Sequence, residues 1–198
     1  MKNDANSVEK QMQKYRFLLC DTTDNSSKIA LSDEKCITSP IQCLSKAFEE
    51  SPEIIVIRFG DIPIREREAL LELIAALKRN RHTSHCNILA LIHSKNRMLI
   101  EHLSRLGVEF VRYTSEIRFD SFQIQEIINS LGPDDATDRH LAILCPFLHY
   151  SRIDSKHEMT VCGAYFDRLV LGGCQLHEIC ETNSHLHCEY YLHQRCSS

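Results

Sequence analysis

The chain has 198 residues, 43% of them hydrophobic, which is enough for one sizeable core and a small second module. Its formal net charge of −4 at pH 7 argues against nucleic acid as the main partner, because proteins that bind nucleic acid carry a basic surface. No apolar run approaches the roughly 18 residues that span a bilayer, and residues 1–15 lack the apolar stretch of an export signal. A cytoplasmic protein that does not enter the membrane is therefore expected.

Five short apolar runs in the first two thirds of the chain predict β-strands. The strongest is EIIVIRF at 53–59, whose β-branched residues and four consecutive apolar positions are typical of a central parallel strand. The other strands are expected at 15–20, 35–38, 87–92 and 108–113.

Helical patterns separate these runs. Ser39 and Pro40 supply an N-cap and a first-turn proline for the first helix, and Gly107 ends a helix at 96–106. The apolar faces are expected at Ile41, Leu44 and Phe48; at Leu70, Leu73, Ile74 and Leu77 of a helix over 65–80; and at Ile124, Ile127, Ile128 and Leu131 after a capping box of Asp120 and Gln123. This alternation predicts an α/β, doubly wound parallel five-stranded sheet of the flavodoxin-like type.

The motif Gly-Pro-Asp-Asp at 132–135 is a helix stop followed by acidic turn residues, and it divides the chain. The predicted organisation has four parts: a polar N-terminal tail at 1–13, the α/β domain at 14–132, a linker at 133–139, and a Cys/His-rich module at 140–198.

The segment 14–131 resembles the receiver domain of bacterial response regulators. The resemblance lies in the order of the elements and in the phrases LLCDTT, SPEIIVIRFGDIP, ILALIHSK and GVEFVRY, which stand at the ends of successive predicted strands. It implies a platform for protein partners such as a sensor kinase, a transcription factor or a second copy of the chain.

The residues that carry out phosphorylation in receivers are largely missing from this sequence. Asp21 matches one of two acidic residues, and the phosphoacceptor position falls on Arg58 or Phe59. Aspartyl phosphorylation needs a carboxylate nucleophile and acidic oxygens that hold magnesium, and an arginine offers neither. Asp61 in the following loop is better explained as a turn residue. The sequence therefore predicts a pseudo-receiver that cannot be phosphorylated.

Six of the ten cysteines and seven of the eleven histidines lie between residues 140 and 196. Thiolates and imidazoles select zinc, iron or an iron–sulfur cluster over magnesium or calcium, and a cytoplasmic address disfavours disulfides. Successive cysteines are separated by 16, 11, 5, 7 and 7 residues, without the C-x2-C pairs of most zinc modules. This spacing favours a cluster held from several segments. The six are Cys145, Cys162, Cys174, Cys180, Cys188 and Cys196.

The phrases CPFLHY, TVCGAY and LHEICETNSHLHCEYYL resemble a cysteine-rich module found beside signalling domains in anaerobic bacteria. That resemblance implies an iron–sulfur site, with a [4Fe–4S] cluster as the first candidate and Zn²⁺ as the alternative. The positions that match its pattern are Cys145, Cys162, Cys180 and Cys188. Glu189 stands where the pattern has proline, which departs from the family beside Cys188.

Other side chains of this region are candidates for extra ligands or for supporting roles. His177 and Cys180 would share a helical face, whereas neighbouring residues such as His185 and His187 rarely bind one metal together. The extra candidates are Cys174, His177, His185 and His187.

The sequence favours a signalling or regulatory protein whose iron–sulfur cluster senses redox state or oxygen. Two alternatives stay open: a zinc-stabilised interaction module and a small electron-transfer protein. A Cys–His nucleophile would make the chain an enzyme, but the abundance of both residues singles out no pair, and no other catalytic motif is present. A non-enzymatic role is therefore preferred, and no catalytic residue is assigned.

Overall fold

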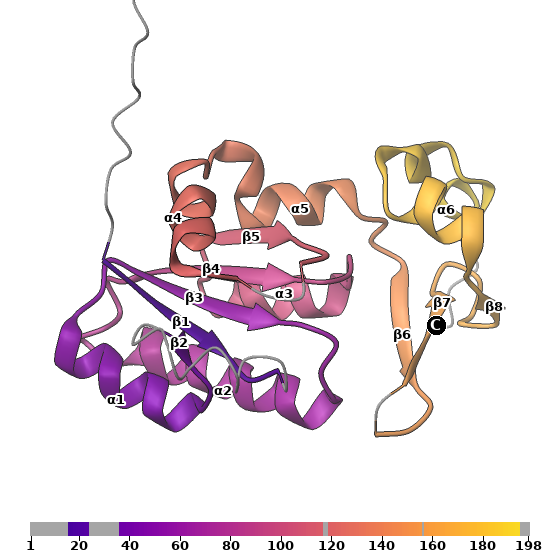
Figure 1. Ribbon diagram of the computed structural model, residues 1–198. Coiled ribbons are helices and arrows are strands. Elements are labelled where there is room, and N and C mark those ends of the chain that lie inside the picture. The colour runs from indigo at the N-terminus through magenta and orange to yellow at the C-terminus, as the bar shows by residue number, and fades with distance from the viewer. Residues whose placement is uncertain (1–15, 24–35, 117–118, 156, 195–198) are drawn as a thin grey trace, which may run out of the picture.

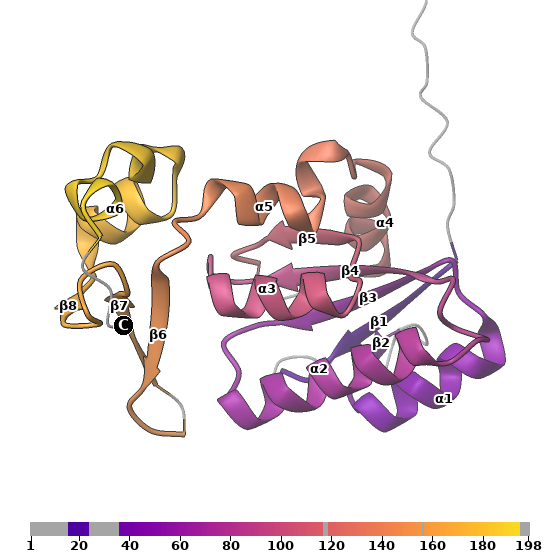
Figure 2. The same cartoon turned by 180° about the vertical axis from the view of Figure 1, so that it is seen from behind.

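The computed structural model describes residues 16–23, 36–116, 119–155 and 157–194. A parallel sheet flanked by helices forms one part of the molecule, and a small antiparallel module lies beside it (Figures 1 and 2). The predicted tail at 1–13 and Cys196 lie outside the described residues.

The first part contains a five-stranded sheet in the order β2-β1-β3-β4-β5, and all of its strand pairs are parallel. This order is that of the flavodoxin-like fold, to which receiver domains belong, so the predicted α/β architecture is confirmed. β3 lies at the centre and is buried along its whole length, as its apolar sequence predicts. The strands are β1 (Phe17–Asp21), β2 (Cys36–Ile37), β3 (Ile54–Phe59), β4 (Asn87–Ile92) and β5 (Phe110–Tyr113).

Helices cover both faces of this sheet. α1 (Pro40–Glu50), α2 (Ile64–Arg79) and α3 (Arg97–Arg105) bury side chains against one face, and α4 (Ser121–Asn129) against the other. The predicted helix signals are present: the Asp120 and Gln123 capping box forms, and Gly107 has a φ of 79° after α3. Asn96 also caps α3, because its side chain accepts a hydrogen bond from the N–H of Leu99 at 3.0 Å.

The predicted apolar face of α1 is wrong. Ile41 is 78% exposed and Phe48 is 41% exposed, whereas Cys43 and Ala47 are fully buried. Small side chains allow a helix to approach a sheet closely, and here they set which side of the helix faces the core. Leu44 packs at the margin of the core, so only part of the predicted stripe is used.

The residues predicted as a linker are ordered in the structure. They form η2 (Pro133–Asp135) and the start of α5 (Thr137–Ile143), which packs against α3 and β5. Thr137 Oγ1 donates to the carbonyl of Val108 at 2.7 Å in a buried position. The segment thus belongs structurally to the α/β part, while the proposed division into domains stays a prediction.

The second part is a three-stranded antiparallel sheet, β6-β7-β8, followed by three short helical segments. Its apolar cluster contains three of the cysteines together with Leu148, Ala164 and Leu171. The elements are β6 (Leu148–Arg152), β7 (Glu158–Cys162), β8 (Leu169–Val170), η3 (Gln175–Cys180), η4 (Asn183–His187) and α6 (Glu189–Leu192).

Among the described residues, no helix is both long enough and apolar enough to cross a membrane.

Candidate functional site

Four predicted ligand cysteines lie on four different segments of the second part. Cys145 precedes β6, Cys162 ends β7, Cys180 ends η3, and Cys188 stands between η4 and α6. The first three belong to one buried apolar cluster, and their exposure is 6%, 6% and 5%. Cys188 is half-buried. We call this group the four-cysteine site.

Backbone hydrogen bonds join the segments that carry these thiols. The N–H of Cys145 donates to the carbonyl of Cys180 at 2.8 Å, so two of the cysteines are linked directly. Leu148 pairs with Cys162 across β6 and β7, which places the end of β7 beside the start of β6. The cysteines far apart in sequence are therefore held by regular main-chain contacts.

The four thiols act on one another electrostatically. Burial is the main cause that raises the pKa of Cys145, Cys162 and Cys180, and the pKa of Cys180 reaches about 12. Neighbouring thiols add to the rise: Cys188 raises the pKa of all three, and Cys145 and Cys162 raise that of Cys180. Cys188 thus lies within electrostatic range of the three clustered thiols.

Backbone N–H groups favour the thiolate form at two of the four positions. Hydrogen bonds from Phe147 to Cys145, and from Ala164 and Tyr165 to Cys162, lower the pKa of these thiols against the effect of burial. Arg97 also lowers the pKa of Cys145 through its positive charge. Donors of this kind stabilise a coordinated thiolate, and in iron–sulfur sites they help to set the reduction potential.

The small residues after Cys162 have a steric reason. A Cβ built on Gly163 would lie 2.6 Å from Cε1 of His149, so any larger residue would displace the imidazole ring. The N–H of Gly163 also donates to the carbonyl of Phe147 at 2.8 Å. Gly163 therefore lets the chain after β7 approach the segment after Cys145.

Aromatic side chains pack around the site. Tyr190 and Tyr191 are half-buried against the cysteine cluster. Tyr191 contacts the ring of Phe147 at a centroid distance of 5.9 Å, and Tyr190 contacts that of Tyr165 at 5.2 Å. These rings limit access of water to the thiols.

The other candidate ligands are placed differently. Cys174 is exposed and lies outside the cysteine cluster. His177 is exposed and contacts Glu181 through Nδ1 at 3.0 Å, and His187 is exposed as well. His185 is buried, with Nδ1 2.7 Å from the carbonyl of Thr182 and its ring against Tyr191. A carbonyl contact at Nδ1 fixes Nε2 as the acceptor nitrogen, which is the arrangement common in metal-binding histidines.

Within the described ranges, no three His, Cys, Asp or Glu side chains form a group that could hold a metal ion.

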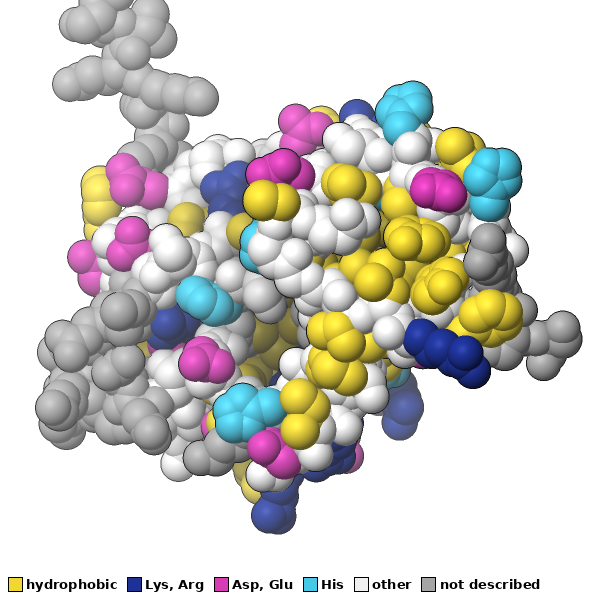
Figure 3. Space-filling view, turned by 90° about the vertical axis from the view of Figure 1, so that its right-hand side faces the viewer, with side chains coloured by type: hydrophobic (Ala, Val, Ile, Leu, Met, Phe, Trp, Pro, Cys, Tyr) yellow, Lys and Arg dark blue, Asp and Glu magenta, His cyan; other side chains and the backbone are white. Residues whose placement is uncertain are grey.

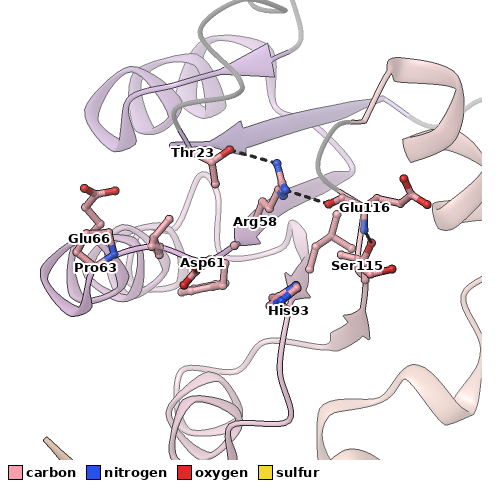
Figure 4. A pocket seen from close by; sticks show the side chains of 13 residues that line it. Thr23, Arg58, Asp61, Pro63, Glu66, His93, Ser115 and Glu116 are labelled. Carbon is pink, nitrogen blue, oxygen red and sulfur yellow. Dashed lines mark hydrogen bonds between the residues drawn. The ribbon is translucent and has the colours of Figure 1, made fainter. Parts of the chain in front are cut away.

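A second candidate site is a cleft of about 400 Å³ at the carboxyl ends of β1, β3, β4 and β5 (Figure 4). This edge is where flavodoxin-like folds bind their ligands. Asp61 and His93, both exposed, line it together with Glu66 and Glu116. The cleft therefore lies where a receiver would carry its phosphorylation site.

Arg58 is buried at the carboxyl ends of β1 and β3, where its guanidinium forms several hydrogen bonds. Its exposure is 7%, and Nη1 donates to Oδ2 of Asp21 at 2.8 Å and to Oγ1 of Thr23 at 3.2 Å. Nη2 donates to the carbonyl of Glu116 at 3.0 Å (Figure 4). The guanidinium also lies 5.5 Å from the centre of the Phe119 ring. The strand register pairs Asp21 with Arg58, so Arg58 and not Phe59 lies beside Asp21 at this edge of the sheet. That this is the acceptor position of a receiver stays a prediction.

Sequence reasoning did not identify the groups that surround the four-cysteine site. The N–H donors of Phe147, Ala164 and Tyr165 carry no side-chain signal, and Arg97 belongs to a helix of the other part. The buried pair of Asp21 and Arg58 could have been anticipated, since two opposite charges at the ends of adjacent strands require partners.

No protein-family model matches the sequence, and no curated protein matches it. Among solved structures, the chain is similar to a response regulator from Desulfuromonas acetoxidans, with 20% sequence identity and a TM-score of 0.39. The match covers 58% of this chain and 94% of that chain. The fold assignment rests on the strand order described above and not on this likeness.

Proposed function

We propose that this chain is a cytoplasmic signalling or regulatory protein in which a receiver-like domain without a phosphoacceptor carries an iron–sulfur cluster that senses redox state or oxygen. The convergence of Cys145, Cys162, Cys180 and Cys188 from four segments carries the proposal. Their N–H donors suit thiolates that bind a metal centre.

The spacing of the cysteines along the chain, without the C-x2-C pairs of most zinc modules, favours a cluster over a single ion. A [4Fe–4S] cluster takes one cysteine at each of four corners, so four thiols from four segments supply a complete ligand set. Such a cluster would supply a one-electron redox centre, and loss of the cluster on oxidation would change the fold around it.

The absorption spectrum of protein purified without oxygen tests this assignment. We expect a brown protein with iron and acid-labile sulfide in equal amounts, whose visible absorption bleaches with dithionite. A colourless protein with stoichiometric zinc would replace the cluster by a structural zinc site.

The zinc-stabilised interaction module is the second candidate, and a surface feature favours a protein partner for this part of the chain. Apolar side chains are exposed on the face shown in Figure 3, which is that of the second part. The large ones exposed in the second part include Ile153, Phe166, Val170, Leu186 and Leu192. Exposed apolar groups of this size are typical of surfaces that bind other proteins.

A small electron-transfer protein is the third candidate, and reversible reduction without any change in partner binding would favour it.

The absence of phosphorylation is a separate part of the proposal. Arg58 forms an ion pair with Asp21, so the strand-end position beside Asp21 carries a guanidinium and no carboxylate that could receive a phosphoryl group. Incubation with a small-molecule phosphodonor and magnesium should leave the intact mass unchanged. A hydroxylamine-labile gain of one phosphoryl group would overturn the pseudo-receiver assignment.

The proposed partners are a sensor kinase, a transcription factor or a second copy of the chain.

A further inference from the structure

Three residues at the start of α3 make several contacts with the cysteine module and the chain that leads into it, and two of them contact residues next to cysteines of the proposed site. These residues are Lys95, Asn96 and Arg97, which we call the Lys95–Arg97 segment. A cleft of about 320 Å³ lies beside them, between the α/β part and the cysteine module.

Arg97 holds the residue before Cys145. Its Nη1 donates to the carbonyl of Leu144 at 2.7 Å and to that of Leu141 at 3.2 Å. Nε donates to Oε1 of Glu101 at 2.8 Å within α3, so the guanidinium is fixed at both ends. The position of Cys145 is therefore tied to the first residue of α3.

Lys95 holds the residue after Cys180. Its Nζ lies 3.4 Å from the carbonyl of Glu181 in hydrogen-bonding geometry. Because the N–H of Cys145 donates to the carbonyl of Cys180, the contacts of Lys95 and Arg97 act on two cysteines that are joined to each other.

The sheet of the second part makes the remaining contacts. The hydroxyl of Tyr150 on β6 accepts from the N–H of Arg97 and donates to the carbonyl of Lys95, both at 3.1 Å. Asn96 Nδ2 donates to Oε2 of Glu158 at 3.3 Å, at the opposite end of β7 from Cys162.

Arg67 of α2 completes this contact. It donates to both carboxylate oxygens of Glu158, at 2.9 and 2.5 Å. Such a bidentate pair fixes the direction of β7 as well as its position.

We propose that the Lys95–Arg97 segment couples the four-cysteine site to the α/β domain, so that filling the site orders this segment and the first turns of α3. The inference rests on the proposed function, because it needs a centre that fills the site. When four thiolates are drawn onto one centre, the segments beside Cys145 and Cys180 become fixed, and their carbonyls hold Arg97 and Lys95 in one arrangement. Whether the site is filled or empty then changes the order of the first turns of α3, which belong to the α/β domain and can be contacted by a partner.

Hydrogen exchange of the full-length protein tests this coupling. The protein is compared in its empty form and after anaerobic loading with ferrous iron and sulfide, with a zinc-loaded sample in parallel. We expect exchange in residues 94–103 to slow by about tenfold on filling, because local opening then requires loss of contacts at a bound centre. Residues 40–50 of α1, which make none of these contacts, should not change.

Substitutions separate the contacts from the site itself. Tyr150→Phe should still allow the protein to bind iron but should lose most of the protection in residues 94–103. Arg97→Gln should lose the same protection, and its iron content is measured alongside, because Arg97 also acts on the Cys145 thiol. Arg105→Gln is the matched control, because Arg105 lies on the same helix, also contacts Glu101, and is 70% exposed. If Arg97→Gln fails to fold, Tyr150→Phe gives the same test by removing a single hydroxyl.

The outcomes distinguish the two proposals. A wild-type protein that binds iron without slower exchange in residues 94–103 would overturn the coupling and leave the proposed function intact. Full protection retained in both Arg97→Gln and Tyr150→Phe would overturn it as well. A wild-type protein that takes up neither iron with sulfide nor zinc would refute the proposed function, and the coupling with it.

Discussion

The side chain of Arg58 sets the charge at the carboxyl ends of the central strands. A buried arginine paired with Asp21 supplies a positive charge where phosphoryl transfer needs an acidic residue and a metal. The pair is almost fully desolvated, since the side chains are 8% and 5% exposed. Removing one partner of a buried ion pair leaves the other charge buried and uncompensated, so the Arg58–Asp21 pair is expected to contribute to the stability of the fold.

Replacing Arg58 by methionine should destabilise the protein strongly. Asp21 would lose this charged partner while staying buried, and such a change costs about 3–5 kcal/mol of unfolding free energy. Urea denaturation measures the loss. The control is Arg16→Met, whose contact with Glu53 is exposed and should contribute less than about 1 kcal/mol. A loss below about 1 kcal/mol at Arg58 would show that the buried pair contributes little to stability.

The buried thiols predict how the stability of the metal-free protein depends on pH. Burial raises the pKa of Cys180 to about 12, above the value near 8.5 of an unfolded cysteine. Folding therefore favours the protonated thiol, and this stabilisation is present below about pH 8.5 and is lost as the pH rises toward about 12. Cys145 and Cys162 shift in the same direction.

Urea denaturation of the metal-free protein at about pH 7 and about pH 10 measures this effect. We expect a lower free energy of unfolding at the higher pH, with a smaller decrease in Cys180→Ala. Equal decreases in the two proteins would show that the Cys180 thiol is not the group that titrates.

At the scale of elements, the orientation of α1 shows how helix faces are set. The helix begins at Pro40 as expected, but Cys43 and Ala47 face the sheet in place of Ile41 and Phe48. Hydrophobic periodicity indicates that an amphipathic helix is present, yet it does not say how much room the sheet leaves beneath it.

Enlarging the buried side of α1 should therefore cost more than trimming its apolar surface. Ala47→Leu places three extra carbons in a filled space and should cost about 1–3 kcal/mol of unfolding free energy. Ile41→Ala removes exposed carbon and should change it by no more than about 0.5 kcal/mol. Thermal or urea denaturation gives both values. A larger loss for Ile41→Ala than for Ala47→Leu would show that α1 buries the face expected from the sequence.

The sequence predicted the elements better than their contacts. Strands such as β3 and β4 follow from unbroken apolar runs, and α4 follows from its capping box, because these signals are local. The four-cysteine set came from the resemblance, and the structure places three of its members in one apolar cluster, while their role as ligands stays a prediction. The contacts of Arg97 with Leu141 and Leu144 could not be predicted, since they join helices that only the folded chain brings together.

At the scale of the whole molecule, the α/β part extends beyond the boundary expected at 132. Asp135 forms a bidentate pair with Arg112 at 2.9 and 2.7 Å, and Leu144 is buried in the main core. The Nε2 of His140 lies 2.8 Å from the carbonyl of Val111. These contacts favour a boundary after α5.

A chain that ends at residue 144 should consequently be more stable without metal than one that ends at 132. The shorter chain loses the buried hydrogen bond of Thr137, the Arg112–Asp135 pair and the burial of Leu144, which together amount to about 3 kcal/mol. Urea denaturation of the two fragments gives the difference. Equal midpoints would support the boundary at 132 that the sequence suggests.

The central claim is that four of the cysteines form one metal centre, and iron content in cysteine variants tests it most directly. Protein is purified without oxygen, and iron and acid-labile sulfide are measured per chain in Cys162→Ser and in the matched control Cys174→Ser. Cys162 is buried in the cluster of thiols, whereas Cys174 is exposed outside it. We predict that Cys162→Ser loses most of its iron, because an open corner admits water and oxidant, and that Cys145→Ser, Cys180→Ser and Cys188→Ser behave alike. Cys174→Ser should keep the wild-type content. Equal losses in Cys162→Ser and Cys174→Ser, or iron retained in Cys162→Ser, would contradict the four-cysteine site.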